Sequence, residues 1–544
     1  MPIKTDWLTP PPSIGGLDHL GTQAPCILAY SQLLPGITNV TDRARYYSFY
    51  PWVIWSLERY AKGMTRQEFV EKFRRADCLF TLIAERHARI SDQDAERHGA
   101  AMVGRIKLTS ALTALEGGTP LRLSRYTAQD SDTRYFQNEM GGLGQYYAGI
   151  LTDFAILDSR SSNWIGYSRE RGQPIAESLE KTVEGKRFWQ TCDSDRVTLA
   201  VLDRLAGFCP CRLPKSTLEH RHLQALFFNE APYAEEEGLS RCNSLSMLLH
   251  LVHALQSSCP GEDLTQLTFR GCIYTRRLPS GAPWELSGNL ENTRTLWALY
   301  ERGDLLSVAF QCIFATALIV MNDAERRFFT AESFAGYFLG TKTLRSALRA
   351  FETTTLESEI ERYRQNGPAL VSWRDAEHEV QLTERVVATP IAEYSRSEDI
   401  VGTAIRCLVA IAAREMSDPW DYTRVGWTEE ALTDFPINLI SFRRRVREWL
   451  PRPMIEVTRE IVQWTLATHL RVALRKLRHT GQSSFRFRPT EMGFEVVQVP
   501  LPANTIPRFR QATQILRDLA MLRRVQGMTR LTALGQKTLE SNSA

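Results

Sequence analysis

Several long stretches of this 544-residue chain are apolar on every side of a helix. The segments Ser240–Gln256 and Val401–Met416 carry apolar side chains nearly all the way round the helix that they would form. A helix of that kind has no polar face for solvent, so it is buried. Capping signals such as Thr65 with Glu68 mark further helices, whereas strand signals are few. The sequence therefore predicts a mainly α, multidomain protein whose helices form its cores.

The clearest strand signal lies in the C-terminal quarter. Residues Phe485–Arg488 alternate aromatic and basic side chains, and Phe494–Val499 is rich in branched residues. Pro489 and Gly493 lie between these two runs and favour a turn. We expect a small β-hairpin here.

One run of the chain is uncharged from Leu305 to Met321, over 17 residues. A membrane-spanning helix needs about 20 predominantly apolar residues. We therefore expect a buried core helix and no membrane partner. The N-terminus lacks the layout of a secretion signal, so we expect a cytoplasmic protein whose ten cysteines are reduced thiols.

Composition suggests where the chain is divided. At about 150 residues per domain, the length favours three or four domains. The stretch Gly207–Pro214 is rich in Pro and Cys, and Ser417–Trp427 is polar and turn-prone. We predict an N-terminal helical domain (1–210), a central helical domain (211–420) and a basic C-terminal domain (421–544). The stretch Thr9–Gly16 is expected to be an irregular leader.

Charge is unevenly distributed along the chain. Residues 437–544 hold 19 basic and 7 acidic residues, a net charge of +12, whereas the remainder has a net charge of −8. Such asymmetry suggests a polyanionic partner for the basic part. The alternatives are an ordinary solvated surface or a basic domain docked on its own acidic neighbour. DNA, bound with little sequence preference, is the expected partner.

The last residues resemble a winged-helix domain. A helix is expected over 512–525, Gly527 should end it, and Thr532 should cap a final helix through Glu540. The stretch LRDLAMLRRVQGMTRLTALGQKTLE resembles the closing half of many winged-helix domains. That resemblance implies that the helix before the wing enters the DNA major groove. Many winged helices instead mediate protein contacts, and fold alone does not decide the role.

Arginine residues supply the candidate phosphate and base contacts. One cluster lies near residue 445, a second is spaced along one face of a helix that follows, and a third lies on or near the expected recognition helix. Like charges on one helix face repel by a few tenths of a kcal/mol each unless a partner neutralises them. The candidate nucleic-acid-binding residues are Arg443, Arg444, Arg445, Arg447, Arg471, Arg475, Arg478, Arg508, Arg510, Arg517, Arg523 and Arg524.

Motifs of known catalytic sites are absent from the sequence. No GxxxxGK[ST], GxGxxG, HExxH or GxSxG pattern occurs. We therefore expect no catalytic residue and no cofactor, although a nuclease site dispersed along the chain remains an alternative.

One pattern invites a zinc interpretation. Cys209, Cys211, His220 and His222 form C-x-C-x8-H-x-H. Ser216 and Glu219 have capping-box spacing, which places both histidines in the first turn of a helix. Two residues then differ by roughly 200° around the axis, so His220 and His222 cannot face one metal ion. We expect no zinc at this motif and no metal site elsewhere.

The most distinctive stretch is LLPGITNVTDRARYYSFYPWVIW, residues 33–55. Tyr46, Tyr47, Phe49, Tyr50, Trp52, Trp55 and Tyr60 lie within it or just after it. We expect a core-filling helix with buried arginine. The alternative is a stacking platform for unpaired bases, in which each base contributes roughly 1–3 kcal/mol.

This stretch resembles the signature of a bacterial domain-of-unknown-function family with an LxPGxSxxxxRxRYxxFxPW pattern. The stretches Leu296–Leu318 and His469–Phe487 are similar to later parts of the same family. The resemblance implies a bacterial origin and an association with genomic islands and phage defence. It implies no catalytic residue.

Three functions follow as expectations. The first is a non-catalytic, DNA-associated component of a bacterial antiphage defence or mobile-element system. The second is a protein-interaction subunit that bridges partners encoded in the same operon. The third is an unrecognised nuclease. The charge asymmetry favours the first, and the missing motifs count against the third.

Overall fold

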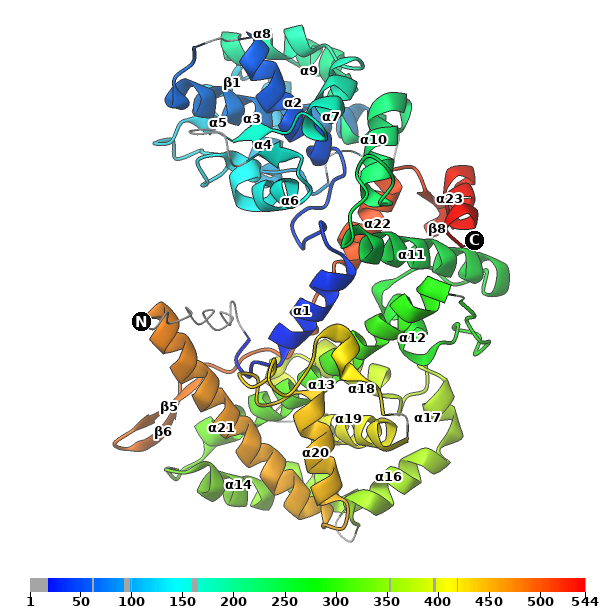
Figure 1. Cartoon of the computed structure of the whole chain (residues 1–544). Coiled ribbons are helices and arrows are strands. Elements are labelled where there is room, and N and C mark those ends of the chain that lie inside the picture. The colour runs from blue at the N-terminus through cyan, green and yellow to red at the C-terminus, as the bar shows by residue number, and fades with distance from the viewer. Residues whose placement is uncertain are drawn as a thin grey trace, which may run out of the picture. The chain divides into compact units, whose positions relative to one another are not determined.

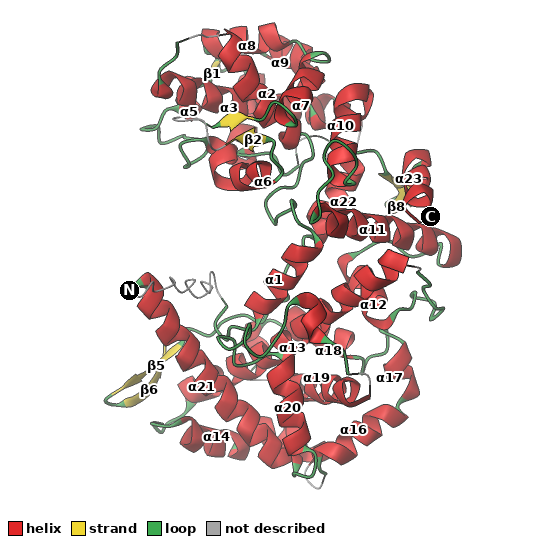
Figure 2. Cartoon of the chain, viewed as in Figure 1, coloured by secondary structure: helices red, strands yellow, loops and turns green. Residues whose placement is uncertain are grey.

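The computed structural model describes residues 18–60, 63–91, 98, 100–158, 165–286, 288–351, 354–394, 398–417 and 419–543. Helices make up 64% of the chain, and the described strands form only two-stranded sheets, as Figure 2 shows. The predicted mainly α fold with small hairpins is confirmed. The leader predicted at Thr9–Gly16 lies outside the described residues.

The chain forms two compact units, each assembled from two stretches of sequence (Figure 1). Unit 1 comprises residues 1–31 and 267–507, and unit 2 comprises residues 32–266 and 508–544. The chain passes between the units three times, near the end of α1 (Gln23–Leu33), at the start of α12 (Gln266–Thr275) and between Pro507 and Arg508.

This division differs from the predicted consecutive domains 1–210, 211–420 and 421–544. The Pro- and Cys-rich stretch near residue 210 lies inside unit 2, and the basic C-terminal region is divided between both units. Turn-prone composition marks places where the backbone reverses. It does not mark where packing ends, because side chains far apart in sequence hold each unit together.

Unit 2 consists of short and medium helices with small two-stranded sheets. Its α-helices are α2 (Tyr46–Tyr60), α3 (Arg66–Ile90), α4 (Arg105–Glu116), α5 (Ser124–Thr127), α6 (Ala148–Asp153), α7 (Gly172–Glu180), α8 (Gly185–Ser194), α9 (Leu199–Arg204), α10 (Thr217–Phe227), α11 (Gly238–Ser258), α22 (Phe509–Asp518) and α23 (Ala533–Ser543). The described part of the unit also contains one short π-helix, η2 (Leu143–Tyr147), and two short 3₁₀-helices, η3 (Leu205–Phe208) and η4 (Pro210–Lys215). The antiparallel strand pairs are β1 (Leu121–Arg122) with β4 (Arg196–Val197), β2 (Leu157–Asp158) with β3 (Gly166–Tyr167), and β7 (Leu522–Val525) with β8 (Met528–Leu531).

The aromatic side chains of α2 from Tyr46 to Trp55 form the core of unit 2. All of α2 from Tyr46 to Leu57 is buried, and Trp52 is 0% exposed. Its rings pack on aromatic side chains of α3, α8 and η3; the Phe49 and Phe80 rings, for example, stack with centroids 3.9 Å apart. The expectation of a core-filling helix is confirmed. A base-stacking platform needs exposed rings, and all of the aromatic rings named above except that of Tyr60 are buried.

Two arginines that precede α2 are buried with it. Arg43 donates from Nε and Nη2 to both carboxylate oxygens of Asp518, at 3.0 and 2.9 Å. Arg45 donates in the same bidentate way to Glu219, at 3.1 and 2.9 Å. A charged side chain inside a protein needs an opposite charge to which it is hydrogen-bonded, and each of these arginines has such a carboxylate. These pairs join α22 and α10 to the start of α2.

The C-terminal segment has the helix, hairpin and helix order expected from the winged-helix resemblance, with one correction. The helix predicted over 512–525 ends at Asp518 as α22, and Leu522–Val525 is strand β7. Gln526 and Gly527 both have positive φ, the backbone of a two-residue hairpin turn. Thr532 accepts a hydrogen bond from the Gly535 amide at 3.0 Å and begins α23, as predicted.

Unit 1 is organised around one long helix, α13 (Gly288–Asp323). Most of α1 and α12 also belongs to this unit. Its remaining α-helices are α14 (Ala331–Gly340), α15 (Lys342–Leu348), α16 (Leu356–Gln365), α17 (Gly367–Val371), α18 (Glu379–Ala388), α19 (Glu398–Ser417), α20 (Leu439–Trp449) and α21 (Met454–Thr480). Three short 3₁₀-helices are also present among its described residues, η5 (Arg349–Phe351), η6 (Ile391–Glu393) and η7 (Tyr422–Val425). The predicted hairpin is confirmed as β5 (Phe487–Thr490) with β6 (Gly493–Val496).

Helix α13 contains the uncharged run noted in the sequence. Among the described helices it alone is long and apolar enough to cross a membrane, and 83% of its most apolar window is buried inside the protein. It packs against α18, α19 and α21. These contacts are those of a core helix, as predicted.

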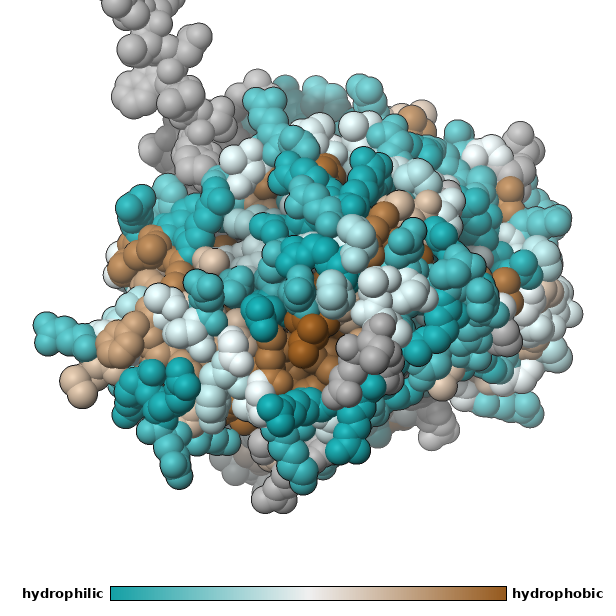
Figure 3. All heavy atoms as spheres, turned by 90° about the horizontal axis from the view of Figure 1, so that it is seen from below, coloured by the Kyte–Doolittle hydropathy of each residue, from teal (hydrophilic) through white to brown (hydrophobic). Residues whose placement is uncertain are grey.

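Buried ion pairs also occur in unit 1. Arg270 donates to Glu301 at 2.9 Å, and Arg302 donates to Glu415 at 2.6 Å. Both carboxylates are fully buried. Figure 3 views the molecule from below, where α14, α16, α20 and α21 of unit 1 lie in Figure 1. Hydrophilic side chains cover most of this face, and its hydrophobic area is confined to separate patches.

Candidate functional site

The twelve candidate arginines do not lie in one domain. The seven from Arg443 to Arg478 belong to unit 1, and the five from Arg508 to Arg524 belong to unit 2. The net charge of the C-terminal region therefore does not define one continuous basic surface. Each group has to be assessed within its own unit.

The expected recognition helix corresponds to α22, and most of its side chains pack inside unit 2. Most of α22 is buried, including Gln511, Gln514 and Asp518, and Gln511 and Asp518 contact the segment before α2. Arg510 donates to Asp42 at 2.8 Å, and Arg508 donates to the Leu34 carbonyl at 2.9 Å. Arg517 is half-buried. The face expected to read DNA is therefore largely used for contacts inside unit 2.

Arg523 and Arg524 are not on that helix. Both are exposed on strand β7, where Arg523 lies opposite Arg530 and Arg524 lies opposite Thr529. They belong to the hairpin that corresponds to the wing. Their side chains are accessible, but they are only two residues on a short ribbon.

The unit 1 arginines have different surroundings. Arg443 points inward, where it donates to Glu415 at 2.6 Å and lies over the Tyr422 ring. Arg475 pairs with Asp434 at 2.6 Å. Arg447 and Arg478 are exposed. The predicted common face of Arg471, Arg475 and Arg478 is therefore not one free basic surface. Arg475 forms an ion pair, whereas Arg471 and Arg478 are exposed.

Three of the predicted arginines come together at a groove of about 440 Å³. Helix α20 contributes Arg444 and Arg445, and helix α21 contributes Arg471. The segment before α20 forms the remaining wall, with Thr433, Phe435 and Asn438 among its lining residues. We call this the arginine groove. Arg444 and Arg445 come from the first sequence cluster and Arg471 from the second, and the two clusters meet only because α20 and α21 fold back on each other.

The charge of the arginine groove is predominantly positive. Glu429 is the one carboxylate among the residues that line it, and its contact with Arg444 spans 3.5 Å between two mostly exposed side chains. Arg445 lies over the Trp464 ring, 4.4 Å from its centroid, while Arg471 donates to the Thr433 carbonyl at 3.3 Å. An exposed pair such as Arg444–Glu429 is weak, so an incoming anion can compete with Glu429.

The fold gives the two histidines of the C-x-C-x8-H-x-H pattern partners other than its two cysteines. His220 contacts the Leu519 carbonyl through Nε2 at 2.8 Å, and His222 contacts the Tyr233 hydroxyl through Nδ1 at 2.8 Å. Both lie near the start of α10, and they have different partners, as the helical geometry predicts. Ser216 makes no side-chain cap; its hydroxyl donates to Thr182 Oγ1 at 3.0 Å, and the Glu219 carboxylate binds Arg45.

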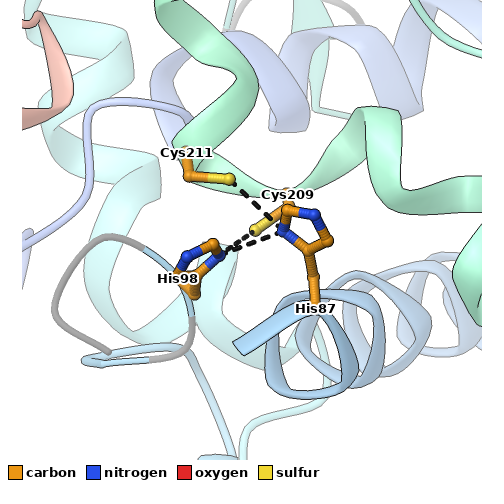
Figure 4. A group of neighbouring side chains, drawn as sticks. All are labelled: His87, His98, Cys209 and Cys211. Carbon is orange, nitrogen blue, oxygen red and sulfur yellow. Dashed lines mark hydrogen bonds between the residues drawn. The ribbon is translucent and has the colours of Figure 1, made fainter. Parts of the chain in front are cut away.

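The cysteines of that pattern instead meet two other histidines. His87 lies in the last turn of α3, His98 lies in the segment that follows it, and Cys209 and Cys211 flank Pro210 where η3 meets η4. Figure 4 shows the four side chains converging. One ligand atom from each lies within 4.8 Å of every other. The nearest approaches are His87 Nδ1 to His98 Nδ1 at 3.0 Å, Cys211 Sγ to His87 Nδ1 at 3.3 Å, and His98 Nδ1 to Cys209 Sγ at 3.4 Å.

The electrostatics of this cluster follow from burial and mutual contact. Burial raises the pKa of the Cys209 thiol well above its ordinary value. Hydrogen bonding to Cys209, together with the neighbouring His98 and His87, lowers the pKa of Cys211. Burial lowers the pKa of His87, which keeps that imidazole neutral.

Sequence reasoning missed this cluster because its two halves are more than 100 residues apart. The Cys-Pro-Cys sequence was a usable signal for one half. Nothing in the local pattern around His87 and His98 identifies them as its partners. The expectation of no metal site rested on His220 and His222, which the structure does not use here.

Comparisons with known proteins give no match. No family model, no curated protein and no solved structure matches the chain. The family suggested by the sequence signature and the winged-helix resemblance therefore stays a prediction.

Proposed function

We propose that this protein is a non-catalytic, DNA-associated component of a bacterial antiphage defence or mobile-element system, acting in the cytoplasm. The observation that carries the DNA-binding part is the arginine groove, which Arg444, Arg445 and Arg471 line together with a single carboxylate, Glu429. The defence or mobile-element context rests on the family resemblance. We assign no catalytic residue.

The geometry of the arginine groove supports contact with the phosphate backbone. Guanidinium groups bind phosphate oxygens through paired hydrogen bonds. Arg445 rests on Trp464, which limits the side-chain freedom that binding would otherwise have to restrict. No feature of the groove favours one base over another, so the expected binding shows little sequence preference.

The alternative role is a bridging subunit that uses the same groove to hold an acidic segment of an operon-encoded protein. The same three arginines support it, because a row of carboxylates presents the same charge as a row of phosphates. DNA is favoured because both duplex and single strands carry closely spaced charge along their whole length.

The test is a fluorescence anisotropy titration of labelled duplex and single-stranded DNA with the full chain. We expect binding that weakens steeply between about 50 and 200 mM salt, because displaced counterions contribute to affinity. The triple variant Arg444→Ala, Arg445→Ala and Arg471→Ala should reduce the slope of log K against log salt by about three, one for each lost phosphate contact.

The chain offers a matched control. Arg447, Arg459 and Arg478 are exposed on the same two helices but do not line the groove. Replacing all three with Ala changes the net charge by the same amount, and this variant should keep most of the affinity. Equal losses in both triple variants would show that bulk charge, not the groove, attracts DNA. No binding by the unaltered protein would refute the DNA proposal and leave the bridging role.

A further inference from the structure

We propose that His87, His98, Cys209 and Cys211 bind one Zn²⁺ ion as a structural site inside unit 2. The proposal is independent of the DNA-binding role, because it rests on a different set of side chains. These four residues form the one group of three or more His, Cys, Asp or Glu side chains in the described chain whose ligand atoms lie close enough together to hold a metal ion.

The spacing of the ligand atoms suits a single tetrahedral ion. Zinc–sulfur bonds of about 2.3 Å and zinc–nitrogen bonds of about 2.0–2.1 Å place neighbouring ligand atoms roughly 3.3–3.8 Å apart. The observed close approaches of 3.0, 3.3 and 3.4 Å are near those values. All six separations stay within 4.8 Å, so small side-chain adjustments suffice.

The identity and number of ligands select the metal. Two thiolates and two neutral imidazoles carry a charge of −2, which balances Zn²⁺ and leaves a neutral site. Neutrality matters because His98 and Cys209 are 0% exposed and an unbalanced buried charge is costly. A two-iron cluster is excluded by size, since it holds its ligand pairs on opposite sides of two metal ions, whereas here all ligand atoms surround one point.

Four protein ligands also indicate a structural role. Catalytic zinc sites keep a position open for water or substrate, while structural sites are closed. The ion would tie the C-terminal turn of α3 and the segment at His98 to the junction of η3 and η4. That junction is already held by Arg45, whose Nη1 donates to the Cys209 carbonyl at 2.6 Å. Such backbone contacts fix the orientation of a metal ligand.

One neighbouring side chain has to move when the ion binds. The Arg212 guanidinium lies 3.2 Å from Nε2 of His87. A neutral imidazole that binds zinc through Nδ1 carries its proton on Nε2, and both groups are then donors. Arg212 is half-buried, so its side chain can turn toward solvent.

The test is metal analysis of the full chain purified without chelators. We expect about one zinc per chain, and a loss to below about one tenth of that in the Cys209→Ser and Cys211→Ser variants. The controls are His222→Gln, which alters a histidine of the sequence pattern that points elsewhere, and Cys242→Ser, which alters a half-buried cysteine outside the cluster. Both controls should retain zinc.

A second measurement does not depend on whether the variants fold. The unaltered protein is stripped of metal and titrated with Co²⁺, which should give the intense visible absorption of a tetrahedral ion and a thiolate charge-transfer band, saturating at about one equivalent. Absence of both zinc and the cobalt spectrum would overturn the proposal. Zinc that persists in Cys209→Ser and Cys211→Ser, or iron in its place, would also overturn it.

Discussion

Breaking the buried pair Arg43–Asp518 by removing one partner should strongly destabilise unit 2. Arg43 is 0% exposed and the Asp518 side chain is 3% exposed. Asp518 accepts two hydrogen bonds from Arg43, one from the Ala44 amide at 3.0 Å and one from Gln514 at 3.0 Å. The substitution Asp518→Ala removes every acceptor of that set and leaves a guanidinium group inside the protein without its counter-charge.

The expected cost is large relative to the stability of a domain. Removing one partner of a buried pair typically costs about 3–5 kcal/mol, out of about 5–15 kcal/mol in total. For a unit of this size, that corresponds to a fall in Tm of roughly 10 °C. Burial raises the pKa of Asp518 even though Arg43 lowers it. The intact pair therefore contributes little net stability, and the cost comes from breaking it.

Urea denaturation followed by circular dichroism measures the effect. The double variant Arg43→Met, Asp518→Leu replaces both charges with apolar groups and should be more stable than Asp518→Ala. Glu139→Ala breaks an exposed pair with Arg66 of similar length, 3.0 Å, and should cost below about 1 kcal/mol. A loss below about 1 kcal/mol for Asp518→Ala would refute the reasoning, because a truly buried guanidinium cannot lose its counter-charge so cheaply.

Two further predictions concern the cores of the units. Trp52→Ala, at a fully buried ring, should lower the free energy of unfolding by about 3–5 kcal/mol. Tyr60→Ala on the same helix, where the ring is 47% exposed, should cost far less, and equal effects would contradict the packing argument. In unit 1, burial lowers the pKa of His469 to about 4, against about 6.5 in the unfolded chain. Its Nε2 accepts the Arg486 amide at 2.9 Å, so the folded state resists protonation. Stability should be full above about pH 6.5 and fall toward pH 4 by up to about 1.4 kcal/mol per pH unit from this group. Thermal melts across that range should show a shallower dependence for His469→Gln, and an unchanged slope would show that His469 does not titrate as described.

Local patterns in the sequence were sufficient for the elements themselves. The capping box of Thr65 and Glu68 is formed as predicted, the hairpin at β5 and β6 is present, and the aromatic run is a buried helix. Each of these features depends on neighbours within a few residues, or on apolar side chains that become buried whichever partners they pack against. The same kind of pattern misled at Glu219, where cap spacing is present but the carboxylate binds Arg45.

Residue patterns alone are enough to predict a helical protein with buried aromatic helices, a short hairpin at β5 and β6 and a final helix that begins after Thr532, because periodicity, capping and turn residues act over a few positions. The same patterns predicted helix where strand β7 lies. Only the tertiary structure decided which distant groups meet: Arg43 with Asp518, the three arginines of the groove, and Cys209 and Cys211 with His87 and His98. The physical reason is that each of these sites depends on charge pairing or ligand geometry across more than 20 residues, and no local pattern records which partner the packing of the helices will bring.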